Sequence, residues 1–297
     1  MTERTMDLVH NHLERLLPLT SRRTTELLPP PEPPESPNKP DYMTRELKIM
    51  SFNVLTRTVG EYALFRRYNG VLETILHTKP DSLGLQEAHE LWREPLKRDL
   101  SKLYGVACDK GRVFGFHEGT PIFYRKDKYE LLREGVFWLS ECPEIASIGW
   151  DAACPRIAGW AVLRELDSGF TYAHFNTHLD HRGKIAMANG AGRMAERIKA
   201  LGLPAVLTGD LNDEPGSLPM QYLETSGLTD LRFIARESDT GATFHDYDED
   251  FAGKIIDYVY ANHYLRGCAS FDVIRDKYDG IYPSDHFAVA ATLTLAN

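Results

Sequence analysis

The sequence predicts an α/β protein in which two mixed β-sheets pack together with helices outside them. Strand-like apolar runs outnumber helical ones from residue 47 onward, and four of them follow one another between residues 121 and 179. One parallel sheet would need strands and helices to alternate strictly, so this order favours two packed sheets. With 297 residues, 42% hydrophobic and 26% charged, the chain can bury a sizeable core.

The expected strands are apolar runs that end at polar or turn-forming residues. In chain order they cover residues 47–55, 81–87, 121–126, 129–140, 157–166, 170–179, 204–212, 254–262, 269–277 and 287–295. Helical patterns cover residues 71–78, 91–103, 183–201 and 217–227. The second helix carries Pro95 near its first turn, where a proline is tolerated.

Residues 1–43 have a different character from the rest of the chain. Residues 29–40 contain seven prolines and predict an extended linker. Before the linker, apolar residues recur at helical spacing (Met6, Val9, Leu13, Leu16 and Leu17). We therefore expect a short amphipathic helix that docks on the protein's own body or on a partner, followed by a main domain over residues 44–297.

Charge and cysteine content exclude several classes of function. The formal charge of −9 argues against tight, nonspecific binding to duplex DNA, which demands a basic face. The four cysteines show no CxxC spacing, so neither a zinc site nor a redox motif is predicted, and reduced core thiols are favoured over a disulfide. No apolar stretch is long enough for a transmembrane segment, and no secretory signal is seen, so we expect a cytoplasmic protein.

Polar side chains stand at the ends of several predicted strands. They are Asn53, Glu87, His178, Asp210, Asn212 and Asp257, and Asp285 and His286 stand before the last strand. Taken alone, Asn53 could form a turn, Glu87 could begin a helix, and His178 could be a core histidine. Asp257 is harder to dismiss, because a carboxylate within an apolar strand is costly without a partner. Together they predict one site, since groups on strand ends can converge on rigid supports.

Seven short motifs occur in an order that resembles the endonuclease/exonuclease/phosphatase superfamily. They are SFNVL (51–55), GLQE (84–87), EGTPIFYR (118–125), NTHLDH (176–181), TGDLN (208–212), IDYVY (256–260) and SDH (284–286). The superfamily includes deoxyribonucleases, abasic-site endonucleases and inositol-polyphosphate 5-phosphatases. GVFWLSECPE, GWDAACPRIAGWA and GATFH further resemble a bacterial branch of unassigned substrate. The resemblance covers about residues 45–296 and implies a four-layer α/β/β/α sandwich with a catalytic domain over residues 44–297.

The resemblance also implies roles for the polar residues. Glu87 would be the principal ligand of a divalent cation, supported by Asn53 and Asp285, and such oxygen ligands suit Mg²⁺ or Mn²⁺. Asp210 would position and deprotonate the attacking water, and Asn212 would donate to the phosphoryl oxygens.

Two histidines are implied as phosphate contacts. His286 would be oriented by Asp257, and His178 by Glu118. A nearby carboxylate favours the imidazolium, so we expect both histidines to be charged.

Residues that could bind the rest of the substrate are less clearly marked. Arg125, Arg156, Asp180 and His181 are candidates, although a structural salt bridge between Arg156 and Asp151 is an equal alternative. Three tryptophans (Trp138, Trp150 and Trp160) could stack on a base or sugar, but core packing is the favoured role.

The leading functional hypothesis is a metal-dependent phosphoesterase that cleaves a phosphodiester in a nucleotide, a short single strand or another small molecule. The alternative is a phosphomonoesterase acting on a sugar, inositol or lipid-headgroup phosphate. A third hypothesis is a binding module that has kept the fold and lost catalysis. It would predict substitutions at Glu87, Asp210 or His286, and none is present.

Overall fold

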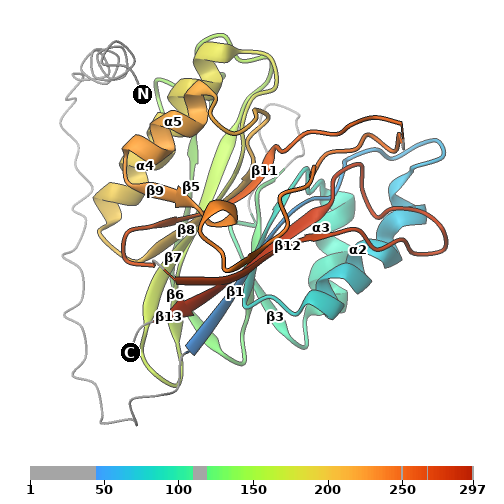
Figure 1. Ribbon diagram of the computed structural model, residues 1–297, viewed down its shortest axis with the longest axis horizontal. Coiled ribbons are helices and arrows are strands. Elements are labelled where there is room, and N and C mark those ends of the chain that lie inside the picture. Colours follow the sequence, from blue (N-terminus) through green and yellow to red (C-terminus); the bar gives the residue numbers. More distant parts are fainter. Residues whose placement is uncertain (1–44, 110–118, 249, 266, 296–297) are drawn as a thin grey trace. The chain divides into compact units, whose positions relative to one another are not determined.

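The computed structural model describes residues 45–109, 119–248, 250–265 and 267–295 (Figure 1). The predicted N-terminal helix and proline-rich linker, and Glu118, lie outside these residues. Within the described ranges, no helix is both long and apolar enough to cross a membrane.

Two mixed sheets form the centre of the fold. The first has seven strands in the order β10-β12-β13-β1-β2-β4-β3, and the second has six in the order β5-β6-β7-β8-β11-β9. The strands are β1 (Arg45–Asn53), β2 (Ser82–Gln86), β3 (Tyr104–Ala107), β4 (Ile122–Arg125), β5 (Tyr129–Trp138), β6 (Ile157–Glu165), β7 (Thr171–His178), β8 (Ala205–Asp210), β9 (Leu228–Asp230), β10 (Glu237–Ser238), β11 (Asp257–Asn262), β12 (Gly267–Ile274) and β13 (Ala288–Leu295). The predicted strands are present, and the short β3, β9 and β10 were not predicted.

Helices cover the outer faces of both sheets. They are α2 (Leu64–Thr78), α3 (Glu90–Leu100), α4 (Lys184–Leu201) and α5 (Leu218–Thr225), and a short 3₁₀ turn η1 (Leu231–Phe233) follows β9. Figure 1 shows α2 and α3 on one side of the sheets and α4 and α5 on the other. This arrangement confirms the predicted α/β/β/α sandwich. Helix α2 begins seven residues before the predicted residue 71, because its first two turns, LFRRYNG, mix apolar with polar residues and include a glycine, so the helical pattern is weak there.

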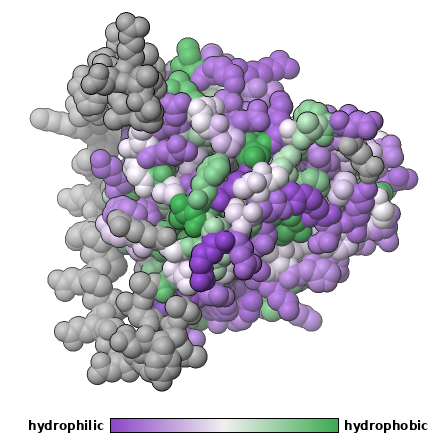
Figure 2. Space-filling view, in the orientation of Figure 1, coloured by the Kyte–Doolittle hydropathy of each residue, from purple (hydrophilic) through white to green (hydrophobic). Residues whose placement is uncertain are grey.

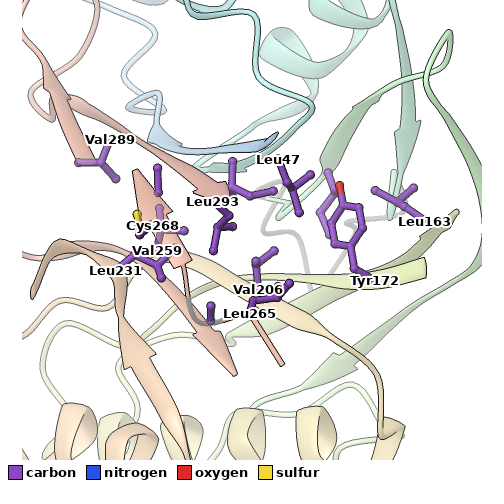
Figure 3. Packing of buried hydrophobic residues seen from close by; sticks show 14 of the residues in the cluster. Leu47, Leu163, Tyr172, Val206, Leu231, Val259, Leu265, Cys268, Val289 and Leu293 are labelled. Atoms are coloured by element: carbon purple, nitrogen blue, oxygen red, sulfur yellow. The ribbon is translucent and has the colours of Figure 1, made fainter. Parts of the chain in front are cut away.

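The core lies in layers because successive strand residues point to opposite faces. Buried side chains between the sheets include Leu47, Tyr172, Val206, Val259 and Leu293 (Figure 3). A second cluster joins the outer face of the seven-stranded sheet to α2 and α3, through residues such as Met50, Phe52, Val71, Ile75 and Trp92. The surface seen in Figure 2 is largely hydrophilic, with apolar residues in small separate groups.

The four cysteines, all of them in the described ranges, form no disulfide, and Cys108 and Cys268 are buried. The prediction of reduced core thiols is therefore confirmed for these two. Burial raises the pKa of the Cys108 thiol to about 12, so this sulfur is protonated and inert.

Strand alternation carries polar residues into one end of the inter-sheet layer. On β1, Leu47 and Ile49 belong to the inter-sheet core, and Asn53 lies on the same face as these two residues. On β8, Val206 shares its face with Asp210. The space between the sheets therefore changes from apolar to polar toward the ends of β1 and β8, where the functional residues lie.

Candidate active site

Strand ends from both sheets meet at one edge of the sandwich. In the first sheet, β1 and β2 run parallel and end there, while β13 and β4 begin there. In the second sheet, β7 and β8 end where β6 and β11 begin, with His178 beside Asp210 and Asp210 beside Asp257. The two edges enclose a cavity of about 700 Å³, whose lining includes Glu87, Arg156, His178, His181, Asp210, Asn212, Asp285 and His286.

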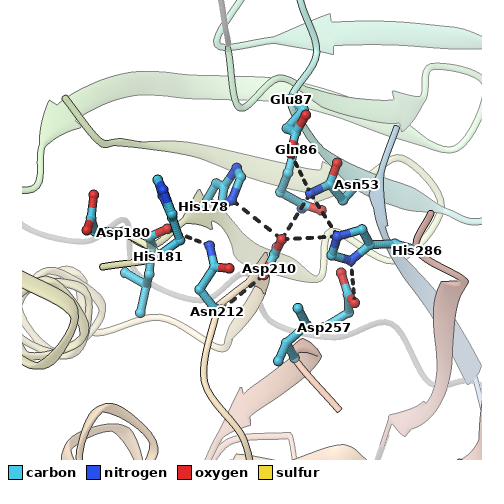
Figure 4. A network of polar contacts seen from close by, with 12 residues as sticks. Asn53, Gln86, Glu87, His178, Asp180, His181, Asp210, Asn212, Asp257 and His286 are labelled. Atoms are coloured by element: carbon cyan, nitrogen blue, oxygen red, sulfur yellow. Dashed lines mark hydrogen bonds and ion pairs between the residues drawn. The ribbon is translucent and has the colours of Figure 1, made fainter. Parts of the chain in front are cut away.

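Asp210 lies at the centre of this site (Figure 4). Its Oδ2 accepts a hydrogen bond of 2.9 Å from Asn53 Nδ2 and lies 3.4 Å from His178 Nε2 and 3.6 Å from His286 Nε2. Its Oδ1 accepts from the Asn212 backbone N–H at 3.0 Å. The carboxylate is almost completely buried, and this burial raises the pKa of Asp210 to about 7. Such a group can accept a proton near neutral pH.

His286 is held between two carboxylates. Its Nδ1 lies 2.9 Å from Asp257 Oδ2, and its Nε2 faces Asp210. Burial opposes a charge on the ring, but Asp257 and Asp210 outweigh it and raise the pKa of His286 to about 10. The ring of Phe244 packs on the imidazole with centroids 4.8 Å apart. His286 is therefore a fixed cation, as the sequence predicted, and it is oriented by Asp257.

His178 differs from the prediction of a charged histidine. Burial holds the pKa of His178 well below its usual value, and the neighbouring side chains of Arg156, His286 and His181 lower it further. Its Nδ1 is buried and has no partner among the described residues. Glu118, the carboxylate predicted to orient this ring, lies outside them, and its role stays a prediction. At neutral pH the described surroundings keep His178 uncharged.

Glu87 and Asp285 are the two carboxylates among the predicted metal ligands, and both line the cavity. Glu87 follows β2 in a left-handed conformation (φ 55°), and its Oε2 accepts from the Thr56 backbone N–H at 2.8 Å. Asp285 accepts from Ser284 Oγ at 3.2 Å. Burial raises the pKa of Asp285, and the charge on Glu87 adds to this rise while His286 opposes it. A cation between the two carboxylates would relieve this repulsion, and an all-oxygen set suits Mg²⁺ or Mn²⁺.

Asn53 has another role than the predicted oxygen ligand. Its Oδ1 accepts from the Leu55 backbone N–H at 3.0 Å, which turns its Nδ2 toward Glu87 Oε1 (3.2 Å) and Asp210. Asn53 is thus a donor that holds two carboxylates in place.

A second donor set with metal-like spacing consists of Asp210, Asp257 and His286, whose ligand atoms lie within 4.8 Å of one another. Both ring nitrogens of His286 already face carboxylates, and a cation would have to displace a proton there. The pair of Glu87 and Asp285 is therefore the better cation site.

The four predicted substrate contacts are found in different places. Arg156 and His181 line the cavity, with Arg156 Nη2 3.3 Å from His181 Nδ1. Asp180 lies beneath them, where its oxygens accept backbone N–H groups of Ala153, Arg182 and Gly183, so it shapes the wall without facing the substrate.

Arg125 is at the opposite edge of the sheet from the cavity. Strands β2 and β4 are antiparallel, so the end of β4 lies beside the start of β2, and Arg125 pairs with Asp127. Its predicted substrate contact is therefore wrong.

The proposed salt bridge between Arg156 and Asp151 is also not formed. Asp151 instead accepts the backbone N–H of Ala186 at the start of α4, at 2.8 Å. Asn212 lines the cavity, with Nδ2 donating to the Leu179 carbonyl at 2.9 Å, and its predicted donation to phosphoryl oxygens stays a prediction. None of the three tryptophans for which stacking was the less favoured role is among the described residues that line this cavity.

Arg67 was missed by the sequence analysis. It is 1% exposed and donates to the carbonyls of Val54, Leu55, Tyr62 and Pro283 at 2.7–2.8 Å. It thereby ties the loop after Asn53 to the segment before Asp285. Burial lowers the pKa of Arg67 from 12.5. The sequence offers little indication of this role, because an arginine in an amphipathic helix is usually exposed and Arg67 precedes the helix predicted over residues 71–78.

A buried polar network below the site was also missed. Gln86 Nε2 donates to Asn176 Oδ1 at 2.7 Å, and Thr208 Oγ1 donates to the same oxygen at 3.1 Å. His174 joins Thr208 and Ser82 through its two ring nitrogens, each at 2.8 Å, and burial lowers its pKa to about 3. These side chains link the two sheets directly behind Asp210. A sequence pattern could have revealed this network. Ser82 and Gln86 on β2, and His174 and Asn176 on β7, are polar residues at alternate positions, which point to the same face of a strand.

Comparison with known proteins gives a consistent family match. The endonuclease/exonuclease/phosphatase family matches residues 50–286. A structure of a family protein from Bacteroides thetaiotaomicron has 30% sequence identity and a TM-score of 0.79, covering 86% of this chain and 96% of that one. A mannosyl-6-phosphatase from the same organism has 30% identity and a TM-score of 0.76, covering 83% and 99%.

A truncated Caenorhabditis elegans TDP2 has 20% identity and a TM-score of 0.66, covering 84% of this chain and 97% of that one, and shows the shared fold alone. A search of the curated proteins finds no match. The family match over most of the chain and the 30% identical structure agree with the seven motifs and with the converging strand ends. The chain belongs to the endonuclease/exonuclease/phosphatase family.

Proposed function

We propose that this protein is a divalent-metal-dependent phosphomonoesterase that acts on a sugar phosphate. The observation that carries the proposal is the charge of the cavity. Arg156, Arg182 and Lys254 line it with cationic side chains, and His286 is protonated. These four cationic groups offset the carboxylates of Glu87, Asp210 and Asp285 that line the same cavity. A divalent cation bound there would leave a net positive charge, which suits the dianion of a monoester better than the single charge of a diester. The 30% identity to a mannosyl-6-phosphatase supports a sugar as the alcohol.

The residues divide the chemistry between a base and a charged donor. Asp210, with its pKa near neutrality, accepts a proton from the attacking water, and Asn53 fixes the carboxylate that does so. The water oxygen bonds to phosphorus as the bond from phosphorus to the sugar oxygen breaks, and the departing alkoxide takes a proton from solvent. His286 donates a charged hydrogen bond to a phosphoryl oxygen, and Asp257 holds its ring at the required angle. A divalent cation held by Glu87 and Asp285 would supply a Lewis acid that neutralises charge on the phosphoryl oxygens.

A phosphodiesterase is the second candidate, and it was the leading hypothesis from the sequence. The cavity extends to both sides of Asp210, from Arg156 to Lys254, so an alcohol on each side of the phosphate can be accommodated. A pure binding module is disfavoured. It would not need a buried Asp210 beside a buried, charged His286, which costs free energy.

Initial rates on three esters would test the proposal. Mannose 6-phosphate, an aryl phosphomonoester and the matching aryl phosphodiester would each be incubated with Mg²⁺ or Mn²⁺. We expect turnover of both monoesters, with mannose 6-phosphate preferred, and loss of turnover with EDTA or in Asp210→Asn. A higher kcat/KM on the diester would overturn the proposal in favour of the second candidate.

A further inference from the structure

One wall of the catalytic cavity holds cationic side chains that the proposed chemistry at Asp210 and His286 does not use. We call Arg156, His181 and Arg182 the β6–β7 cluster, because Arg156 precedes β6 and the other two follow β7. All three line the cavity. The guanidinium of Arg182 makes no ion pair with any described residue, and its backbone N–H donates to Asp180.

Arg156 is the buried member of this cluster. It is 8% exposed, and its Nε has no hydrogen-bond partner among the described residues. The carboxylate of Asp180 is 3.9 Å away, beyond hydrogen-bond distance, and it already accepts three backbone N–H groups. Asp180 therefore forms an ion pair with Arg156 without a hydrogen bond to its Nε. A buried donor that lacks a hydrogen-bond partner is costly, so an anion is expected to complete the site.

The strand order separates the backbone of this cluster from that of the reacting centre. The second sheet has the order β6-β7-β8-β11, and Asp210 ends β8. Arg156 is therefore two strands from Asp210, which corresponds to about 10 Å at the spacing of neighbouring strands. That separation is comparable to the length of a hexose with a substituent at each end. A phosphoryl group at His286 and an anion at Arg156 can thus belong to one sugar.

We propose that the β6–β7 cluster binds a second anionic group on the leaving alcohol, so the preferred substrate is a sugar phosphate that carries another phosphate or a carboxylate. This inference rests on the proposed phosphomonoesterase function. It assigns Arg156 and Arg182 to substrate selection, while Asp210 and His286 remain with the scissile phosphate. A charged hydrogen bond contributes enough free energy to change the dissociation constant about tenfold or more.

Binding can be measured separately from catalysis in the Asp210→Asn protein. Isothermal titration calorimetry with Mg²⁺ would compare mannose 6-phosphate, mannose 1,6-bisphosphate and 6-phosphogluconate. We expect at least one two-anion ligand to bind about tenfold more tightly than mannose 6-phosphate. The tighter of the two identifies the second group as phosphate or carboxylate.

Two further charge changes locate the effect. Adding Arg182→Gln should remove most of the preference for the two-anion ligand. Lys184→Gln is the matched control, because Lys184 is exposed and pairs with Asp213 outside the cavity, and it should keep the preference. Equal dissociation constants for one-anion and two-anion ligands, or equal effects of the two substitutions, would overturn the inference. Failure of the wild-type protein to hydrolyse any monoester would instead overturn the proposed function, and the two failures are therefore distinguishable.

Discussion

Substitution of Asp257 by Asn should remove the charge of His286 while keeping its hydrogen-bond geometry. Asp257 Oδ2 lies 2.9 Å from His286 Nδ1, and its charge is the largest of the effects that raise the pKa of this histidine. The rise from 6.5 to about 10 corresponds to about 5 kcal/mol in favour of the protonated ring. Without Asp257, burial should dominate, and His286 should be neutral at pH 7.

The expected consequence is a change in the pH profile of kcat/KM. In the wild-type protein, activity needs Asp210 deprotonated and His286 protonated, so it should rise through about pH 7 and fall through about pH 10. In Asp257→Asn the alkaline fall should move to lower pH. The maximum should then drop by about 10²- to 10³-fold, the usual effect of losing one donor to the developing charge.

The assay is kcat/KM for a phosphomonoester between pH 5.5 and 10.5 at constant metal concentration. Asp239→Asn is a suitable control, since Asp239 is a partly exposed carboxylate that pairs with Arg275 and does not line the catalytic cavity. An alkaline limb that stays in place in Asp257→Asn would refute the charged role of His286.

Three other changes test separate parts of the structure. Glu87→Gln should raise the Mn²⁺ dissociation constant at least tenfold in calorimetry, and an unchanged constant would exclude Glu87 as a ligand. Arg67→Met should lower the free energy of unfolding in urea by about 3 kcal/mol or more, because it leaves four carbonyls without their donor. Arg66→Met, at an exposed neighbour, should change it by less than about 0.5 kcal/mol. Removal of residues 1–43 should leave kcat/KM on a small ester within about twofold, and an inactive truncation would show that the catalytic domain needs this segment.

The position of most site residues could be predicted because a polar residue that follows or precedes an apolar run marks the end of a strand. Asp210 and His286 each border an apolar run, and such a run fixes both the strand and its end. The apolar runs do not show whether two neighbouring strands pair parallel or antiparallel. EGTPIFYR holds Arg125 at the end of β4, but β4 is antiparallel to β2, so its start and not its end lies at the site. Pairing direction depends on contacts distant in sequence.

Charge states and amide orientations were less predictable, because they depend on the surroundings of single atoms. His178 ends β7 and His286 precedes β13, and each has a carboxylate nearby. Their pKa values are nevertheless shifted in opposite directions, down for His178 and up for His286. The difference is that His286 has Asp257 on its second nitrogen, whereas His178 is surrounded by Arg156 and two other histidines. Likewise, the single backbone N–H of Leu55 decides that Asn53 presents nitrogen to the site.

The separate pKa values of Asp210 and His286 explain how one buried cluster can supply both a base and a charged hydrogen-bond donor. A carboxylate with pKa near 7 and an imidazole with pKa near 10 are both in their working forms between these values. Burial alone would neutralise both groups, and mutual attraction alone would make Asp210 too weak a base. Asp257 separates the two effects, because it adds negative charge that favours protonated His286 and disfavours deprotonated Asp210. The buried aspartate in an apolar strand, costly by itself, is therefore the group that sets the pH range over which the site can work.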